Sequence, residues 1–239
     1  MWYTFTDAQS PVPDLSGRNH EGILKGTPTW MAEGKPVGSY YFNGSSGTSI
    51  DDSIIIDDAV LGDFNFTNSS SFTIMAWIKP KPVTSNDCAP NRRLIFVYDP
   101  YAEGKSIADR TVLQFALMDS YSSNPDALIV KYGGPNGGYN LIGPAVVNDA
   151  WQHVAVTRNV TAEGIKVSLY LNGSLFSSGM DTTSGPWNLT GSVPRIGGLY
   201  DDCSAYSGGY WYNGSIGDFR SYNSSLSEGE LQNIWETTK

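Results

Sequence analysis

Short runs of alternating apolar residues, repeatedly closed by Gly, Asn, Pro and Ser, cover the whole chain. The clearest run is Ser71–Lys79 (SFTIMAWIK). Phe72 and Ile74 lie on one side of this period-two pattern, and Met75 and Trp77 lie on the other. A strand that is apolar on both sides is typical of one buried between two layers. The pattern therefore predicts an all-β, two-sheet antiparallel sandwich.

Further segments fit the same architecture. Strands are predicted at Val112–Met118, Ala127–Tyr132, Trp151–Arg158 and Lys166–Leu171. Asn172-Gly173 and Asn213-Gly214 are expected to form hairpin turns, because Asn and Gly tolerate the positive φ that tight turns need.

One short C-terminal helix is predicted, since Ser227 and Glu230 have the spacing of a capping box. No linker, charge block or internal repeat divides the sequence. We therefore expect a single domain over residues 1–239.

The charge balance excludes several partners. The formal net charge is −9, and the 15 Lys and Arg residues are scattered. Nucleic acid and anionic membrane surfaces need a basic face, so neither is an expected partner. No apolar run is long enough to cross a bilayer, which argues against membrane insertion. The opening residues, MWYTFTDAQ, show no leader peptide.

Asn-X-Ser/Thr sequons are unusually frequent. There are eight, at Asn43, Asn65, Asn68, Asn159, Asn172, Asn188, Asn213 and Asn223. Their number favours a glycosylated extracellular protein, on a cell or virion surface. Alternatively, the Asn-Gly-Ser cases are only turn chemistry.

The two cysteines, Cys88 and Cys203, both stand in polar segments. In an exported protein they are expected to form a disulfide, and the alternative is two free thiols.

Several segments, in order, resemble the laminin-G-like and pentraxin-like jelly rolls of the concanavalin A-like lectin/glucanase superfamily. They are WYTFTD, DLSGRNHEGIL, TPTW, YYFNGSSG, SFTIMAWIKP, WQHVAVTRN, VSLYLNGSLFSSG, RIGG and YNGSIGDFRSYNSSLSEGELQNIW. The resemblance covers nearly the whole chain and implies a jelly-roll sandwich. It also implies that Trp77 and Trp151 fill the space between the sheets, and that His153 is structural.

The same resemblance implies a structural calcium ion between the loop near the N-terminus and the final strand. The ligands would be Asp14 and Asp218, with Asn19 and the carbonyl of Gly22. These supply the oxygen donors that calcium prefers. Two departures weaken the match, because Arg18 and Gly217 stand where the family often has Asn and an acid. The alternative is a capped turn in which Asp14 binds local amides.

Catalytic patterns are few. The alternating Glu-x-Asp-x-Glu of glycosidases on this fold does not occur in a strand, and the two His and two Cys lack zinc spacing. A polysaccharide lyase needs only a Tyr or His base and a basic residue, so a polysaccharide-degrading enzyme stays open as the alternative function.

The leading interpretation is a non-catalytic carbohydrate-binding or adhesion module within a larger multidomain surface protein. Its partner would be a glycan or glycoprotein, held by aromatic and polar side chains on loops. A structural domain that contacts another protein is a third option. The predicted ligand-binding residues are Asp201, Asp202, Tyr206, Tyr210, Trp211, Tyr139 and Arg92. For the segment around Cys203, a disulfide-pinned loop over a sheet edge is an equal alternative.

Overall fold

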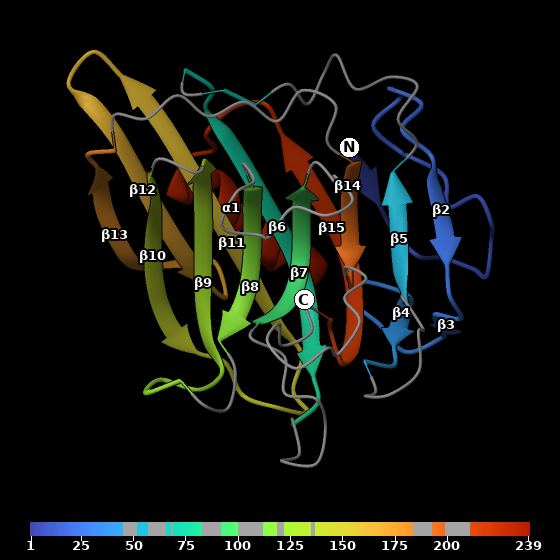
Figure 1. The fold of residues 1–239 in the computed structure, drawn as a ribbon. Coiled ribbons are helices and arrows are strands. Elements are labelled where there is room, and N and C mark those ends of the chain that lie inside the picture. The colour runs from blue at the N-terminus through green and yellow to red at the C-terminus, as the bar shows by residue number, and fades with distance from the viewer. Residues whose placement is uncertain are drawn as a thin grey trace.

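Two antiparallel sheets face each other in a sandwich (Figure 1). The computed structural model describes residues 1–44, 52–56, 66–67, 69–82, 92–99, 112–118, 122–134, 137–183, 193–198 and 211–239. The first sheet, named the β6 sheet, has the order β13 (Ser174–Asp181), β12 (Gly164–Leu171), β11 (Gln152–Thr161), β6 (Phe72–Pro80), β15 (Gly214–Tyr222), β4 (Ser39–Phe42), β3 (Thr29–Met31), and β1 (Trp2–Tyr3) also pairs with β15.

The second sheet, named the β8 sheet, packs against the first. Its order is β10 (Gly137–Ala145), β9 (Ala127–Gly134), β8 (Val112–Met118), β7 (Arg92–Asp99), β14 (Val193–Gly197), β5 (Ser53–Ile56), β2 (Gly22–Lys25). The predicted two-sheet antiparallel architecture is confirmed. In the described part of the chain no helix is long and apolar enough to span a membrane.

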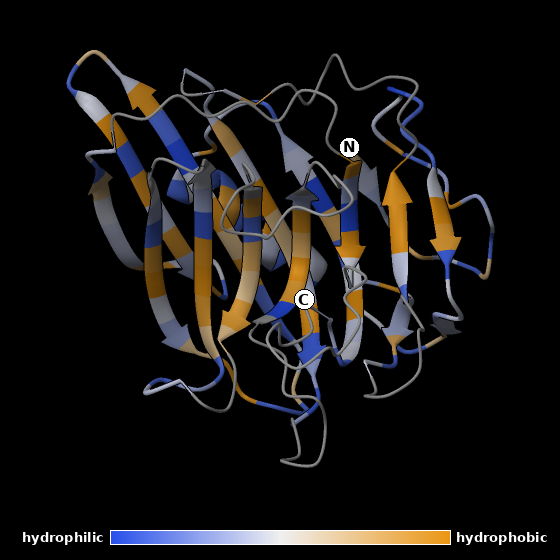
Figure 2. Ribbon diagram, in the orientation of Figure 1, coloured by the Kyte–Doolittle hydropathy of each residue, from blue (hydrophilic) through white to orange (hydrophobic). Residues whose placement is uncertain are grey.

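The main core lies between the sheets. Phe72 and Ile74 of β6 are fully buried there, together with Phe115 of β8. Apolar residues follow the strands that bound this space (Figure 2). Alternation along β6 sends Met75 and Trp77 to the opposite side of the sheet, as the period-two pattern requires.

The two predicted tryptophan anchors are placed differently from expectation. Trp77 is buried, but it packs on His153 under the C-terminal helix instead of between the sheets. Trp151 precedes β11, is only half-buried, and donates from Nε1 to Glu33 Oε1 at 3.2 Å. The prediction that both fill the inter-sheet space was wrong, because period two does not say which side of a strand faces the partner sheet.

Helix α1 (Glu228–Thr238) covers the outer side of the β6 sheet (Figure 1). Its capping box is confirmed: Ser227 Oγ accepts from the Glu230 N–H at 3.3 Å, and the Glu230 carboxylate accepts from the Ser227 N–H at 2.7 Å. Leu231 packs on Met75 of β6 and on Tyr170 of β12. The helix therefore explains why β6 is apolar on both sides.

One predicted hairpin turn is confirmed and the other is not. Asn172 and Gly173 join β12 to β13 with φ values of 50° and 77°. Gly214 instead begins β15 and pairs with Phe42 of β4 and Pro80 of β6. Because both edges of β15 are occupied by these strands, it has no free edge for a hairpin partner.

Candidate functional site

Trp2 is held between the loop of residues 14–22 and the last strand. Its backbone N–H donates to Asp14 Oδ1 at 2.8 Å, and its indole Nε1 donates to Asp218 Oδ1 at 2.7 Å. The Arg220 guanidinium lies 4.4 Å from the centre of the Trp2 ring, in cation–π geometry. The two carboxylates predicted from the family resemblance thus bind the same residue, Asp14 at its backbone and Asp218 at its indole ring.

Asp14 organises the loop around it. Its oxygens also accept from Ser16 N (3.0 Å), Ser16 Oγ (2.7 Å) and His20 N (3.2 Å). Burial opposes ionisation of Asp14, but the hydrogen bonds from Ser16, Trp2 and His20 outweigh it and hold its pKa below the ordinary value. Asn19 has a φ of 60°, a conformation that Asn tolerates better than most residues. This geometry matches the alternative prediction, a capped turn in which Asp14 accepts from local amides.

Asp218 lies at a β-bulge in β15, with a φ of 21°, and is 1% exposed. The bulge turns its carboxylate toward Trp2 and Arg220. Arg220 Nη2 donates to Asp218 Oδ2 at 2.8 Å, and Arg220 Nε lies 3.2 Å from both oxygens. A buried carboxylate needs such a partner, because an unpaired charge away from water is strongly unfavourable.

The groups that surround these two carboxylates are not arranged to coordinate a calcium ion. Calcium needs six to eight oxygen ligands, and the oxygens of Asp14 and Asp218 face N–H, O–H and guanidinium groups. The Gly22 carbonyl, a third predicted ligand, accepts from Val12 N at 2.7 Å. Calcium binding here stays a prediction, and thermal unfolding across a calcium titration tests it, because binding would raise Tm.

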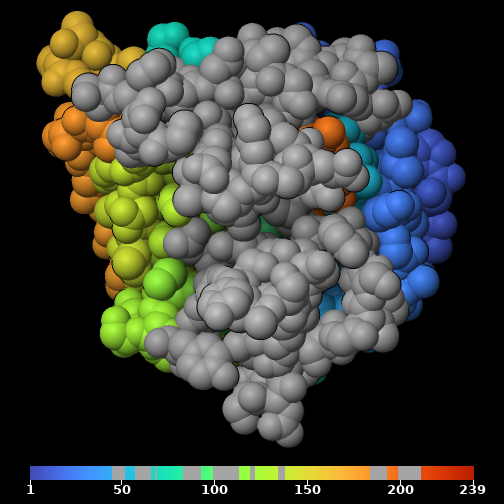
Figure 3. Space-filling view, in the orientation of Figure 1, coloured from blue at the N-terminus to red at the C-terminus, as the bar shows by residue number. Residues whose placement is uncertain are grey.

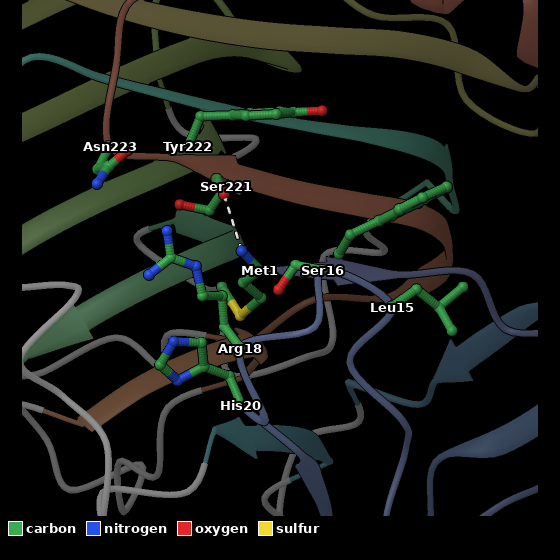
Figure 4. A pocket seen from close by; sticks show the side chains of 9 residues that line it. Met1, Leu15, Ser16, Arg18, His20, Ser221, Tyr222 and Asn223 are labelled. Carbon is green, nitrogen blue, oxygen red and sulfur yellow. Dashed lines mark hydrogen bonds between the residues drawn. The ribbon is translucent and has the colours of Figure 1, made fainter.

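Trp2 lines a pocket of about 410 Å³. Figure 4 shows this pocket from close by. It lies between the loop of residues 14–22 and the end of β15. Its described lining consists of Met1, Trp2, Leu15, Ser16, Arg18, His20, Ser221, Tyr222 and Asn223. We name it the N-terminal pocket. Its volume falls in the range of small-ligand sites. Its lining contains aromatic rings together with amide, hydroxyl and guanidinium groups.

Ser221 gives this pocket an unsatisfied buried hydroxyl. The residue is 2% exposed, and its Oγ has no hydrogen-bond partner among the described residues. Its backbone is fixed, because Ser221 N donates to the Met1 carbonyl at 3.0 Å and the Met1 amino group donates to the Ser221 carbonyl at 3.1 Å. In Figure 4 the Arg18 guanidinium extends from the loop toward Ser221 and Asn223. A buried hydroxyl without a protein partner is costly, so Ser221 Oγ is a candidate contact for a polar group that enters the pocket.

The residues that the sequence put forward for ligand binding do not meet at this pocket. Asp201, Asp202, Tyr206 and Tyr210, like Cys88 and Cys203, lie outside the described residues. Arg92 begins β7, and nothing is described of its side chain.

Tyr139 and Trp211 are described, and they lie apart from the pocket lining. Tyr139 is on the edge strand β10 and packs against Tyr132, with ring centres 5.6 Å apart. Burial, and then the negative charge of Asp181, raise the pKa of Tyr139. Trp211 lies against Gly44, just after β4. Strand β10 and the N-terminal segments form opposite flanks of the molecule (Figure 3).

Sequence reasoning did not single out four residues that line this pocket: Trp2, Ser221, Tyr222 and Asn223. Trp2 and Tyr222 stood inside motifs that indicated only the fold, and Ser221 looks like any other strand serine. One sequence signal could have indicated this pocket. The loop of residues 14–22 and the final strand were predicted to share a calcium ion, so they were expected to lie side by side.

The chain belongs to the concanavalin A-like lectin/glucanase superfamily, whose family model matches residues 48–232. This confirms the resemblance seen in the sequence motifs. A comparison with curated protein sequences gave no match.

Solved structures show the same fold at low sequence identity. The binding domain of Paraclostridial Mosquitocidal Protein 1 is 16% identical with a TM-score of 0.67, and the match covers 98% of this chain and 51% of that one. The chain therefore spans about half the length of that binding domain. Domain 4 of AbnA, a GH43 extracellular arabinanase from Geobacillus stearothermophilus in complex with arabinotriose, is 16% identical with a TM-score of 0.64, covering 98% and 96%.

A third structure is the CBM40 of the Ruminococcus gnavus IT-sialidase bound to alpha2,3 sialyllactose. It is 17% identical with a TM-score of 0.54, and the match covers 80% of this chain and 96% of that one.

Proposed function

We propose that this chain is a non-catalytic carbohydrate-binding module that holds a glycan in the N-terminal pocket. The observation that carries the proposal is the buried, unpartnered Ser221 hydroxyl at an aromatic-walled pocket. Two structures of this fold hold arabinotriose and sialyllactose, which supports a sugar as the ligand class.

The chemistry of the lining suits a sugar. Sugars present C–H faces that pack on aromatic rings, and hydroxyls that both donate and accept hydrogen bonds. Trp2 and Tyr222 supply rings, and Ser16, Ser221 and Asn223 supply polar groups. Trp2 is held by hydrogen bonds to Asp14 and Asp218, so its ring is preorganised and loses little entropy on binding.

A binding role is favoured over hydrolysis because no described residue of the lining is acidic. Glycoside hydrolysis normally needs two carboxylates flanking one bond. Asp14 and Asp218, the acids beneath the pocket, are fully engaged with Trp2, Ser16 and Arg220. Release of reducing ends or unsaturated sugars from cell-wall polysaccharides would contradict this part of the proposal.

We also propose an extracellular location for the module, on a cell or virion surface, where it would serve adhesion. The sequons support this location, and the location in turn predicts a Cys88–Cys203 disulfide. Mass spectrometry of the non-reduced protein from its native source would test both modifications.

Ser221→Ala tests the binding proposal directly. The variant should weaken binding to the best ligand of a glycan array by about three- to tenfold, the value of one lost hydrogen bond. The free energy of unfolding should stay equal or rise by up to about 1 kcal/mol, because an unsatisfied buried hydroxyl is removed. Isothermal titration calorimetry and urea unfolding measure the two effects.

Ser177→Ala is the matched control, because Ser177 lies on β13 and is not among the described pocket residues. It should leave affinity unchanged. Equal affinity of Ser221→Ala and the unmodified chain would contradict a ligand contact at this hydroxyl.

A further inference from the structure

One sequon lies at the mouth of the N-terminal pocket. Asn223 begins the sequence Asn223-Ser224-Ser225, directly after β15, and its side chain is exposed while it lines the pocket. Three other sequons, at Asn65, Asn68 and Asn188, lie outside the described residues. The four remaining ones are not among the described residues of the lining.

We propose that Asn223 is an N-glycosylation site whose glycan closes the N-terminal pocket. The closing effect rests on the proposed function, whereas the modification itself does not. In the transfer, Asn223 Nδ2 forms a bond to the anomeric carbon of a sugar on a lipid-linked oligosaccharide diphosphate. The bond from that carbon to the diphosphate oxygen breaks, and the amide proton leaves with the lipid diphosphate.

The backbone on both sides of Asn223 is anchored, so an attached glycan cannot swing away with the chain. Before it, Ser221 N donates to the Met1 carbonyl at 3.0 Å. After it, Thr73 Oγ1 donates to the Ser224 carbonyl at 2.8 Å and accepts from Leu226 N at 2.9 Å. The Asn side chain has only two rotatable bonds, so the first sugar must stand next to the pocket.

Two other sequons are less open. Asn172 Oδ1 accepts from His153 N at 3.0 Å, and Asn213 Oδ1 accepts from the Tyr41 hydroxyl at 3.2 Å. Both residues are half-buried. Asn43 is exposed, and it lies at the opposite end of β15 because Phe42 pairs with Gly214. The nine residues of β15 put it roughly 30 Å from Asn223. Asn43 is therefore a distant control.

The experiment compares the full chain secreted from mammalian cells with the chain made in bacteria, which lack this modification. Peptide mass spectrometry reads the occupancy of Asn223 and Asn43. Ser225→Ala removes the sequon but keeps the Asn223 side chain, and Asn43→Gln removes the distant sequon. The probe is a printed array of neutral and acidic oligosaccharides, read by titration of its strongest spot.

We expect Asn223 to be occupied, and the secreted chain to bind the array at least about tenfold more weakly than the bacterial chain, a loss of about 1.4 kcal/mol. Ser225→Ala should restore the bacterial affinity, and Asn43→Gln should not. If Asn43 carries a glycan and Asn223 does not, the assignment of Asn223 as a glycosylation site is wrong. An occupied Asn223 with undiminished array binding would overturn the closure.

A second readout separates this inference from the proposed function. Acrylamide quenching of Trp2 fluorescence, isolated by subtracting Trp2→Phe, should be weaker in the secreted chain than in secreted Ser225→Ala. If the bacterial chain binds no oligosaccharide, the proposed function fails, and the quenching still decides whether the glycan covers the pocket. Equal quenching in both secreted chains would refute the closure.

Discussion

Replacing Arg158 with Met should lower the free energy of unfolding by about 3–5 kcal/mol, because it leaves a buried carboxylate without its cation. Arg158 is fully buried on β11, and its Nη2 lies 3.7 Å from Asp181 Oδ2 on β13. Urea unfolding at neutral pH measures the loss. An effect below about 1 kcal/mol would show that water reaches this pair and screens it.

The size of the effect follows from how the cluster crosses the sandwich. Arg158 Nε donates to the Tyr132 hydroxyl of β9 at 3.2 Å, and that hydroxyl donates to Asp181 Oδ2 at 2.7 Å. The cluster thereby joins the β6 sheet to the β8 sheet. The Asp181 side chain is only 1% exposed, so solvent cannot replace the guanidinium.

Two further variants control the measurement. Lys79→Met removes an ion pair of 2.7 Å to Glu33, whose side chain is 62% exposed, and should cost at most about 1 kcal/mol. Asp181→Asn in the Arg158→Met background should recover part of the loss, because it removes the unpaired charge. Failure of the second change to recover stability would mean that lost packing, not charge, causes the effect.

The sequence predicted the sandwich well because its signal is local. Period two along β6, the Asn172-Gly173 turn and the Ser227 capping box each depend on neighbouring residues, and each is confirmed. The orientation of Trp77 was missed because it depends on helix α1, which lies far along the chain.

The site was less predictable because it forms from segments that are distant in sequence. Asp14 and Asp218 were both expected near the junction of loop and final strand, and Trp2 does join them. Whether their oxygens face a metal or N–H donors depends on Arg220, which no periodicity reveals. Likewise, Ser221 becomes a buried pocket hydroxyl only because the chain at Met1 pairs with it.

His153 is fully desolvated beneath helix α1, with a consequence for acid stability. It is 1% exposed, and neither ring nitrogen has a partner among the described residues. Its ring packs edge-on against Trp77 at 5.5 Å, and Trp77 Nε1 donates to Thr238 of the helix at 2.8 Å. Burial, and then the positive charge of Arg220, lower the pKa of His153 to about 3.

The expected result is a loss of about 2 kcal/mol of stability between pH 7 and pH 5 through His153 alone. The unfolded chain takes up the proton below about pH 6.5, whereas the folded chain resists it down to about pH 3. Between these values acid therefore favours the unfolded state, by about 1.4 kcal/mol per pH unit. His153→Met and His153→Gln, neither of which can be protonated, should both lack this part of the pH dependence. Urea unfolding at pH 7 and pH 5 gives the difference between each variant and the unmodified chain, in which the contributions of other groups cancel. If the free energy of unfolding of all three proteins falls equally between pH 7 and pH 5, the folded protein takes up a proton at His153 in mild acid. That result would contradict the buried, unpartnered geometry of this ring.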